Sequence, residues 1–124
     1  MPYDEFPVTP RTHLEDTGVR VTVTVRGKEI PLAAWRVTLP DVAPLYLLEP
    51  VNEADRWITR RLYNGGADDR VVQEIVLGVG GVRLLRALAI DTDVYHFNEG
   101  HAVFAGLELI RERMAAGDAS EAAW

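Results

Sequence analysis

The chain has 124 residues, of which 48% are hydrophobic and 26% are charged, and this length and balance are typical of one globular domain. No run approaches the roughly 20 apolar residues of a membrane span, and the first residues, MPYDEF, lack the basic start and apolar core of a signal peptide. We therefore expect a cytoplasmic protein. The net charge of -6 argues against nucleic acid or an anionic membrane as its partner, because both attract clustered Lys and Arg.

Residue counts remove most self-contained catalytic chemistries. The absence of cysteine excludes disulfides, thiolate catalysis and Cys-based zinc sites. The only serine, Ser120, lies in a small, polar C-terminal stretch, so a buried serine nucleophile is not expected. The only lysine, Lys28, lies between two strand-like runs, where a desolvated Schiff-base lysine is not expected either.

The N-terminal half predicts a hairpin and a third strand. Residues 1–18 contain three prolines and are expected to form an extended lead-in. Residues 19–25 (VRVTVTV) alternate apolar and polar side chains, which is typical of a half-buried strand. A second strand is expected over 29–39, where Pro31 favours an edge position or a late start. Residues 45–48 (LYLL) are continuously apolar, which favours a strand covered on both faces.

Two helices are expected next. Asn52 can cap a helix over residues 53–62, which has acids early and Arg late, as the helix dipole prefers. The NGG run at 64–66 ends it. Asp68 or Asp69 opens a longer helix, whose apolar residues recur at three- and four-residue spacing.

Three glycines, Gly78, Gly80 and Gly81, lie inside this longer helix. Each costs about 1 kcal/mol relative to Ala in a helix interior. Either the helix breaks there, or another backbone packs too closely for a Cβ, which is the interpretation we favour. The run is not a dinucleotide-binding fingerprint, because Arg83 stands where the third glycine is required and no strand immediately precedes it.

The last part of the chain predicts a strand and a helix. Residues 93–97 read as a strand, NEG follows at 98–100, and a helix begins near His101. Residues 115–124 form a small, polar tail. The expected fold class is therefore α/β, with a hairpin and a strand followed by helix, helix, strand and helix.

The candidate site is the segment with Asn98, Glu99 and His101, at the end of the expected strand and just before a helix. Open α/β sheets bind ligands at such strand ends, where polar side chains and free helix N–H groups converge. The alternative is that Asn98 or Glu99 caps the helix and His101 is merely exposed. Spacing alone leaves both interpretations open.

A metal site is not predicted. His96 lies in the expected strand and His101 in the expected helix, so they lack the continuous helical geometry of the H-E-x-x-H and H-x-x-E-H motifs. No third ligand is evident, and His13, in the lead-in, reads as a surface residue.

Several blocks, in order, resemble one enzyme family. They are AWRV at 34–37, PLYLL at 44–48, RLYNGG at 61–66, QEIVLGVGGVR at 73–83 and VYHFNEGHA at 94–102. Together these residues resemble the α-glucan (glycogen/maltodextrin) phosphorylases, and most closely the compact bacterial and archaeal branch. The resemblance covers residues 19–114 and implies an internal fragment of the N-terminal domain, an α/β piece of a larger domain.

Members of that family are dimeric glycosyltransferases that release glucose 1-phosphate from α-1,4-glucans by using inorganic phosphate and pyridoxal phosphate bound covalently to a lysine. The resemblance implies pyridoxal phosphate in the parent enzyme. Because the cofactor lysine and the basic phosphate-binding loops belong to the later domain, we expect this chain to bind no cofactor and to be inactive alone.

By match to the family's motif, Asn98, Glu99 and His101 line the glucosyl subsite, and none of them is the catalytic acid. Phe97 and Val103 depart from the family's usual residues, which affects local packing. The resemblance also implies that residues 63–70 form a mobile loop that gates the cleft. Its gate residues are Asn64, Gly65 and Gly66.

A rival interpretation is a free-standing module that keeps the fold and binds a glucan or a protein. In either case we expect the chain to self-associate, because a piece cut from a larger sheet leaves strands unpaired. Residues 19–25 and 45–48 are the surfaces expected to be exposed.

Overall fold

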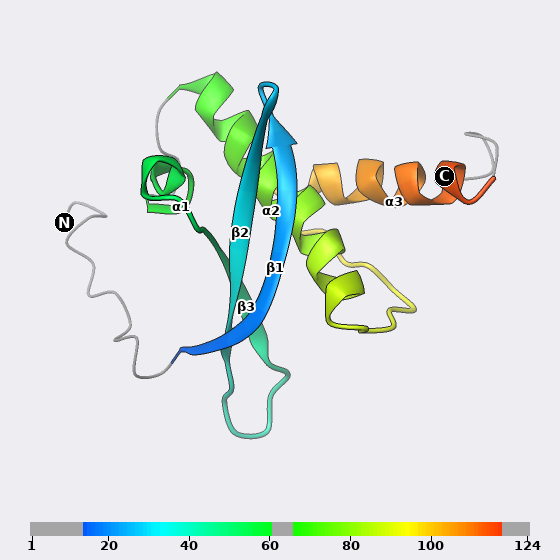
Figure 1. Ribbon diagram of the computed structural model, residues 1–124. Helices are drawn as coiled ribbons and strands as arrows, with labels where there is room; N and C mark the ends of the chain where they lie inside the picture. The colour runs from blue at the N-terminus through cyan, green and yellow to red at the C-terminus, as the bar shows by residue number, and fades with distance from the viewer. Residues whose placement is uncertain (1–13, 61–65, 118–124) are drawn as a thin grey trace.

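The computed structural model describes residues 14–60 and 66–117. The elements in chain order are β1 (Glu15–Val25), β2 (Lys28–Val37), β3 (Leu45–Pro50), the 3-10 helix η3 (Glu53–Asp55), α1 (Trp57–Arg60), α2 (Ala67–Ala87) and α3 (Val103–Ala115). The strands form an antiparallel sheet in the order β1-β2-β3. Helix α2 packs on one face of this sheet, and α3 packs on α2 and projects away from the strands (Figure 1). The expected α/β class is confirmed.

The N-terminal hairpin forms as the sequence predicts. The turn consists of Arg26 and Gly27, which both have positive φ, 53° and 73°. Such a two-residue turn matches the right-handed twist of the flanking strands. Strand β1 begins at Glu15, upstream of the alternating run, and a register shift between Asp16 and Arg20 marks a bulge in it.

Strand β2 corrects the expectation drawn from Pro31. The strand begins at Lys28 and lies at the centre of the sheet, so neither an edge position nor a late start is right. The carbonyl oxygen of Pro31 accepts a hydrogen bond from the Val51 N–H at 2.9 Å, so the backbone of Pro31 faces β3. The bond that Pro31 cannot make is the reciprocal one to the carbonyl of Val51, which lies just past the end of β3 at Pro50, so the bonds within β3 are kept.

Strand β3 forms where the apolar run predicts it, but it is not covered on both faces. Helix α2 covers one face, whereas Leu45 and Leu47 on the opposite face are 54% and 42% exposed. Within the described residues β3 is also an edge strand. The continuous apolar run therefore marks a surface that this part of the chain leaves open.

The helix expected over residues 53–62 divides into η3 and α1, and its last residues lie outside the described part. Asn52 precedes η3, but its side chain makes no capping hydrogen bond. Instead Asp55, only 5% exposed, accepts a hydrogen bond from the Nζ of Lys28 at 2.6 Å. This ion pair joins η3 to the start of β2.

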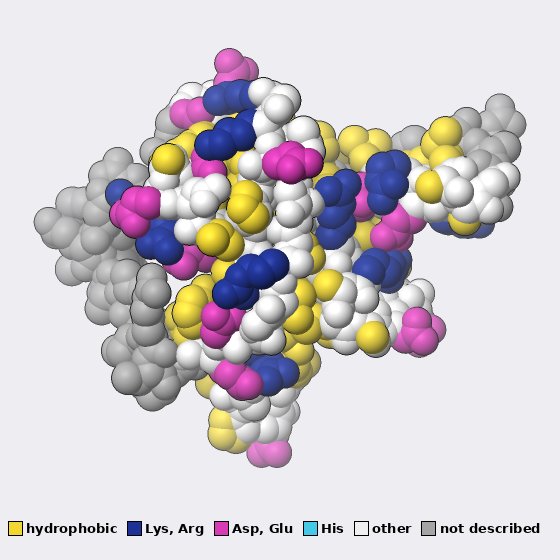
Figure 2. All heavy atoms as spheres, in the orientation of Figure 1, with side chains coloured by type: hydrophobic (Ala, Val, Ile, Leu, Met, Phe, Trp, Pro, Cys, Tyr) yellow, Lys and Arg dark blue, Asp and Glu magenta, His cyan; other side chains and the backbone are white. Residues whose placement is uncertain are grey.

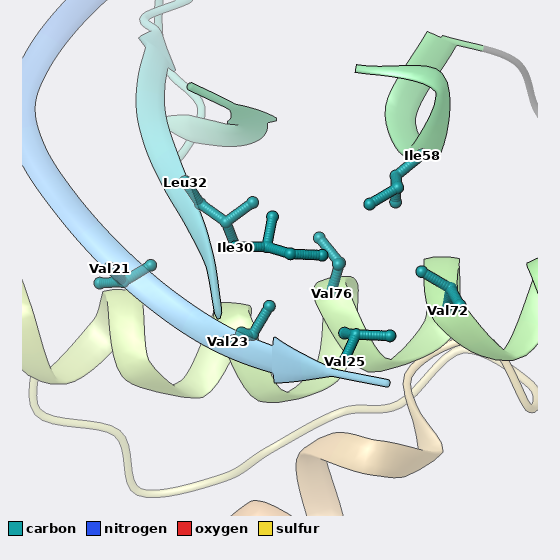
Figure 3. Close-up of a cluster of buried hydrophobic side chains, with 8 residues drawn as sticks. All are labelled: Val21, Val23, Val25, Ile30, Leu32, Ile58, Val72 and Val76. Atoms are coloured by element: carbon teal, nitrogen blue, oxygen red, sulfur yellow. The ribbon is translucent and has the colours of Figure 1, made fainter. Parts of the chain in front are cut away.

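The apolar core lies between the sheet and α2 (Figure 3). It comprises Val21, Val23, Val25, Ile30, Leu32, Ile58, Val72 and Val76. Leu32 and Val23 have no exposed surface. These residues come from β1, β2, α1 and α2, so among the described residues this cluster forms without any contribution from α3.

The glycines of α2 serve close packing, and the helix runs unbroken through them. A Cβ on Gly78 would lie 2.5 Å from the backbone nitrogen of Ala105 in α3. A Cβ on Gly80 would lie 2.9 Å from Leu32 in β2. A Cβ on Gly81, in contrast, would meet no described atom within 4 Å. The prediction that another backbone packs too closely for a Cβ is confirmed at Gly78, whereas the close neighbours of Gly80 are the side chains of Leu32 and Leu48.

The strand expected over residues 93–97 is absent, and this segment has no regular secondary structure. A strand needs a neighbour for its backbone N–H and C=O groups. Among the described residues, the sheet consists of β1, β2 and β3, and none of these strands pairs with this segment. The prediction of a strand over residues 93–97 is therefore wrong for the described structure, in which most of these residues are exposed.

Candidate substrate-binding site

The candidate residues Asn98, Glu99 and His101 lie in the turn that leads into α3. The helix begins at Val103, slightly later than expected, and its N-cap residue is Ala102. No side chain caps this end of the helix, so in the described structure neither Asn98 nor Glu99 performs the capping role of the alternative interpretation.

Glu99 adopts a backbone conformation that is uncommon for its residue type. Its φ is 55°, in the left-handed region that glycine and asparagine favour. The turn brings the carboxylate Oε2 to 3.5 Å from Nε2 of His101. The Glu99 side chain is 76% exposed and that of His101 is 32% exposed. A carboxylate accepts from hydroxyl groups and a neutral imidazole both donates and accepts, so the pair is suited to a polyol.

Two of the three candidates line a hollow of about 1010 Å³. We use "the hollow" for the space bounded by β3, α2, residues 92–98 and the start of α3. Asn98 and His101 lie on its wall, together with His96, whereas Glu99 lies outside it. The structure therefore brings an amide and an imidazole together at one end of a mainly apolar concavity.

Arg86 fixes the segment that carries these residues. Its guanidinium donates to the Tyr95 hydroxyl at 2.8 Å and to Glu112 Oε2 at 2.9 Å, and it lies over the Tyr95 ring. The hydrogen bonds to Glu112 and Tyr95 raise the pKa of Arg86. One side chain of α2 thereby holds both α3 and the segment before it.

A second ion-pair cluster attaches α3 to α2 through a buried carboxylate, and it consists of Arg83, Glu108 and Arg111. Glu108 is 4% exposed. It accepts from Arg83 Nε and from Arg111 Nε, each at 2.9 Å. Arg83 also donates to the carbonyl of Thr22 in β1 at 2.7 Å. Figure 2 shows the acidic and basic side chains gathered where α3 leaves the body of the molecule.

The pKa of Glu108 is lowered despite its burial. Burial alone raises the pKa of its carboxyl, but hydrogen bonds from Arg111 and Arg83 outweigh that effect. The charged form is therefore the stable one, and it holds α2 and α3 together.

Sequence reasoning missed these positioning residues, although a signal was present. The arginines 83 and 86 are three apart on α2, and the glutamates 108 and 112 are four apart on α3, so each pair lies on one face of its helix. Complementary charges on two such faces indicate helices that pack side by side.

The proposed gate is only partly described. Asn64 and Gly65 lie outside the described residues, and Gly66 is the N-cap residue of α2. The gate therefore remains a prediction.

The described residues do not fit pyridoxal phosphate. The ammonium group of Lys28, the only lysine of the chain, is engaged in the ion pair with Asp55, and Lys28 does not line the hollow. Residues 14–60 and 66–117 also contain no group of three or more His, Asp or Glu side chains that could hold a metal ion. In the same ranges, no helix is both long enough and apolar enough to cross a membrane.

Comparison with known proteins finds maltodextrin and glycogen phosphorylases among the relatives. The chain is 40% identical over 118 residues to a maltodextrin phosphorylase of Thermococcus litoralis, covering 92% of this chain and 14% of the relative. It is 50% identical over 116 residues to a glycogen phosphorylase of Mycobacterium tuberculosis, and the match covers 86% of this chain and 13% of the relative. A glycogen phosphorylase of Aquifex aeolicus is 35% identical over 116 residues, covering 90% and 17%.

These relatives are much longer than the chain, which spans only 13% to 17% of their length. No protein-family profile matches the chain, and no solved structure matches it either.

Proposed function

We propose, from the premise that this chain is homologous to one region of the α-glucan phosphorylases, that residues 19–114 form part of the N-terminal domain of such an enzyme. The whole enzyme would transfer glucosyl units from α-1,4-glucans to inorganic phosphate in the cytoplasm. The observation that carries the proposal is the extent of the similarity, which reaches 50% identity and covers 86% of the chain.

Within that enzyme, the chain would supply one wall of the sugar subsite. The amide of Asn98 and the imidazole of His101 share the wall of the hollow, and both can donate to and accept from sugar hydroxyls. Glu99, at the rim, can accept from a hydroxyl and hold His101 in its orientation. These residues would position the sugar and would not transfer protons to the scissile bond.

The chain alone is expected to lack phosphorolysis. Its only lysine is paired with Asp55, so the pyridoxal phosphate of the parent enzyme would be held by residues outside this chain. The gate residues Asn64, Gly65 and Gly66 would act on the same cleft only when the rest of the enzyme is present.

Self-association of the isolated chain is part of the proposal, in a corrected form. Helix α2 covers the apolar face of residues 19–25, of which Val21, Val23 and Val25 are buried, so this face is not an open surface. The open surfaces are the unpaired edge of β3 and the exposed Leu45 and Leu47. Sedimentation velocity should show association that grows with concentration, and a monomer at every concentration would contradict it.

A chimera tests the proposed function directly. In it, this chain replaces the matched region of the Mycobacterium tuberculosis glycogen phosphorylase, and glucose 1-phosphate release from maltodextrin is measured. We expect an active enzyme in which Asn98→Ala and His101→Ala raise KM for maltodextrin. Asn52→Ala, at an exposed position whose side chain makes no capping bond, is the control.

The outcomes separate the alternatives. An active chimera whose KM is unchanged by both substitutions would exclude the sugar-wall role. A chimera that does not fold, together with maltodextrin binding by the free chain, would favour the free-standing glucan-binding module.

A further inference from the structure

The hollow is poorly matched to a glucosyl unit alone. Its volume of about 1010 Å³ lies at the upper end of the range for small-molecule pockets, roughly 300–1,000 Å³. Much of its wall is apolar and exposed. Leu47, Leu77, Val94 and Phe97 are 42%, 51%, 79% and 38% exposed. A contiguous apolar surface of this kind is typical of a protein–protein contact.

The edge of β3 presents unpaired backbone groups to the hollow. In an antiparallel ladder, residues that bond to a given neighbour alternate with residues that point away from it. Because Val51 donates to Pro31 in β2, the backbones of Leu47 and Glu49 also face β2. Those of Tyr46 and Leu48 therefore face the opposite side, where the described residues provide no strand. Both residues line the hollow.

Gly81 supports the same interpretation independently. Gly78 and Gly80 are explained by the close approach of α3 and of the sheet, whereas the space beside Gly81 is open. Gly81 lines the hollow, next to the glycine that packs on Leu48. A glycine lowers helix stability, and one at this position allows another backbone to approach α2 closely.

We propose that the hollow receives an apolar β-strand from the part of a phosphorylase polypeptide outside the region that this chain matches. The strand pairs with the backbone of Tyr46 and Leu48, covers Leu47 and Leu77, and passes against Gly81. Pairing with an exposed sheet edge is an established mode of polypeptide recognition. The inference rests on the proposed function, because that function supplies the strand.

The identity of this occupant follows from two observations. The relatives carry more than four-fifths of their length outside the matched region, so they contain chain that can fill the space. A second copy of this chain fits less well, because two concave surfaces are not complementary. The other free edge of the sheet, on β1, carries the charged Asp16 and Arg20 rather than an apolar face.

Gly81→Ala tests the close approach, because it should act in opposite directions in two settings. In the free chain the space beside Gly81 is open, so alanine should lower the unfolding equilibrium constant by roughly fivefold through helix propensity alone. In the chimera described above, the added methyl group should meet the incoming strand and lower the temperature at which activity is lost.

Leu77→Asp tests the apolar contact. Leu77 is 51% exposed in the free chain, so the substitution should lower its thermal unfolding temperature only slightly, through the poorer helix propensity of Asp and the partial burial of Leu77. In the chimera it should place a carboxylate inside the interface and abolish soluble, active protein. Val42→Asp is the matched control, because Val42 is 58% exposed and does not line the hollow. It should have no effect in either protein.

The outcomes distinguish this inference from the function on which it rests. If the unsubstituted chimera is inactive and unfolded, both proposals are wrong. If the unsubstituted chimera is active, but Gly81→Ala stabilises it and Leu77→Asp leaves it intact, only the strand-docking inference is overturned. If Leu77→Asp dissociates a dimer of the free chain and is tolerated by the chimera, the occupant is a second copy and the inference is also overturned.

Discussion

Helix α2 is held on two sides by different kinds of interaction. Toward the sheet, it packs against a dry aliphatic cluster from β1, β2 and α1. Toward α3, it uses a glycine contact at Gly78 and two arginine–carboxylate clusters around Glu108 and Glu112. Aliphatic burial is insensitive to pH and increases with the area removed from water, whereas ion pairs depend on protonation and salt.

This difference matters because the candidate site lies on the polar side. Asn98, Glu99 and His101 lie in the turn before α3, and Arg86 holds the segment before them through Tyr95. The site is therefore carried by the part of the molecule whose attachment is weaker and more easily changed. The hollow beside the site is open, whereas α2 covers one face of the sheet.

Substitution of a core residue between the sheet and α2 should have the largest effect on stability. Leu32 has no exposed surface and lies against Gly80 of α2. Leu32→Ala should lower the free energy of unfolding by about 3–5 kcal/mol, because it removes transfer energy and leaves a cavity. Urea unfolding followed by circular dichroism measures this. Leu45→Ala, at a 54% exposed position, is the control and should cost less than about 0.5 kcal/mol. Equal costs at both positions would mean that the aliphatic cluster does not dominate.

Substitution of a charged residue between α2 and α3 should have a smaller effect on stability. Glu108→Gln keeps the shape of the side chain but removes the charge that Arg83 and Arg111 share. The cost should be about 1.5–3 kcal/mol, since hydrogen bonds to charged groups are lost while both arginines remain partly exposed to water. Glu53→Gln, whose 81% exposed carboxylate pairs with Arg56, is the control and should cost under about 1 kcal/mol. A Glu108→Gln protein as stable as this control would remove the cluster from the account.

Gly78→Ala should also weaken the packing of α3 on α2. A Cβ there would lie 2.5 Å from the Ala105 backbone, which cannot rotate away as a side chain can. Overpacking of this kind costs about 1–3 kcal/mol, partly offset by the better helix propensity of alanine. Near-ultraviolet circular dichroism and urea unfolding should both report the loss. If alanine instead stabilises the chain, α3 does not pack closely on this glycine.

The difference between the two sides should also appear as a dependence on pH. Because the pKa of folded Glu108 is lowered below its ordinary value of 4.5, its contribution is complete above that pH. It is then lost as the pH falls through the folded-state pKa. The free energy of unfolding should decrease over this acidic range, and Glu108→Gln should make the decrease shallower. An identical pH profile in the variant would show that other carboxyl groups cause it.

The same division explains how far the sequence alone predicts the molecule. The alternation of residues 19–25, the spacing within α2 and the close packing at Gly78 and Gly80 follow from local patterns, and the structure confirms them. Local patterns were misleading at Pro31, because its effect depends on where the neighbouring strand ends.

The remaining errors share a physical cause. Residues 45–48 and 93–97 have the apolar composition of buried strands, yet the described residues leave the first open on one face and the second unpaired. Composition indicates which environment suits a segment, but it does not say which neighbouring part of a chain supplies that environment. The candidate site could be predicted from sequence because its motif is contiguous, whereas the arginines that hold the preceding segment and α3 lie on another helix and act through tertiary contacts.

Hydrogen exchange of the backbone amides tests the central contrast most directly. On this account, the aliphatic cluster stabilises the sheet and α2, and the ion pairs attach α3 to α2. The amides of β1, β2 and the buried face of α2 should then exchange only through global unfolding. The amides in the middle of α3 should exchange through local opening at a lower free energy. Because the contacts of Glu108 are broken both in this local opening and in global unfolding, Glu108→Gln should lower both values, whereas Leu32→Ala should lower only the global value. Equal protection in β2 and α3, lowered to the same extent by Leu32→Ala, would contradict the account.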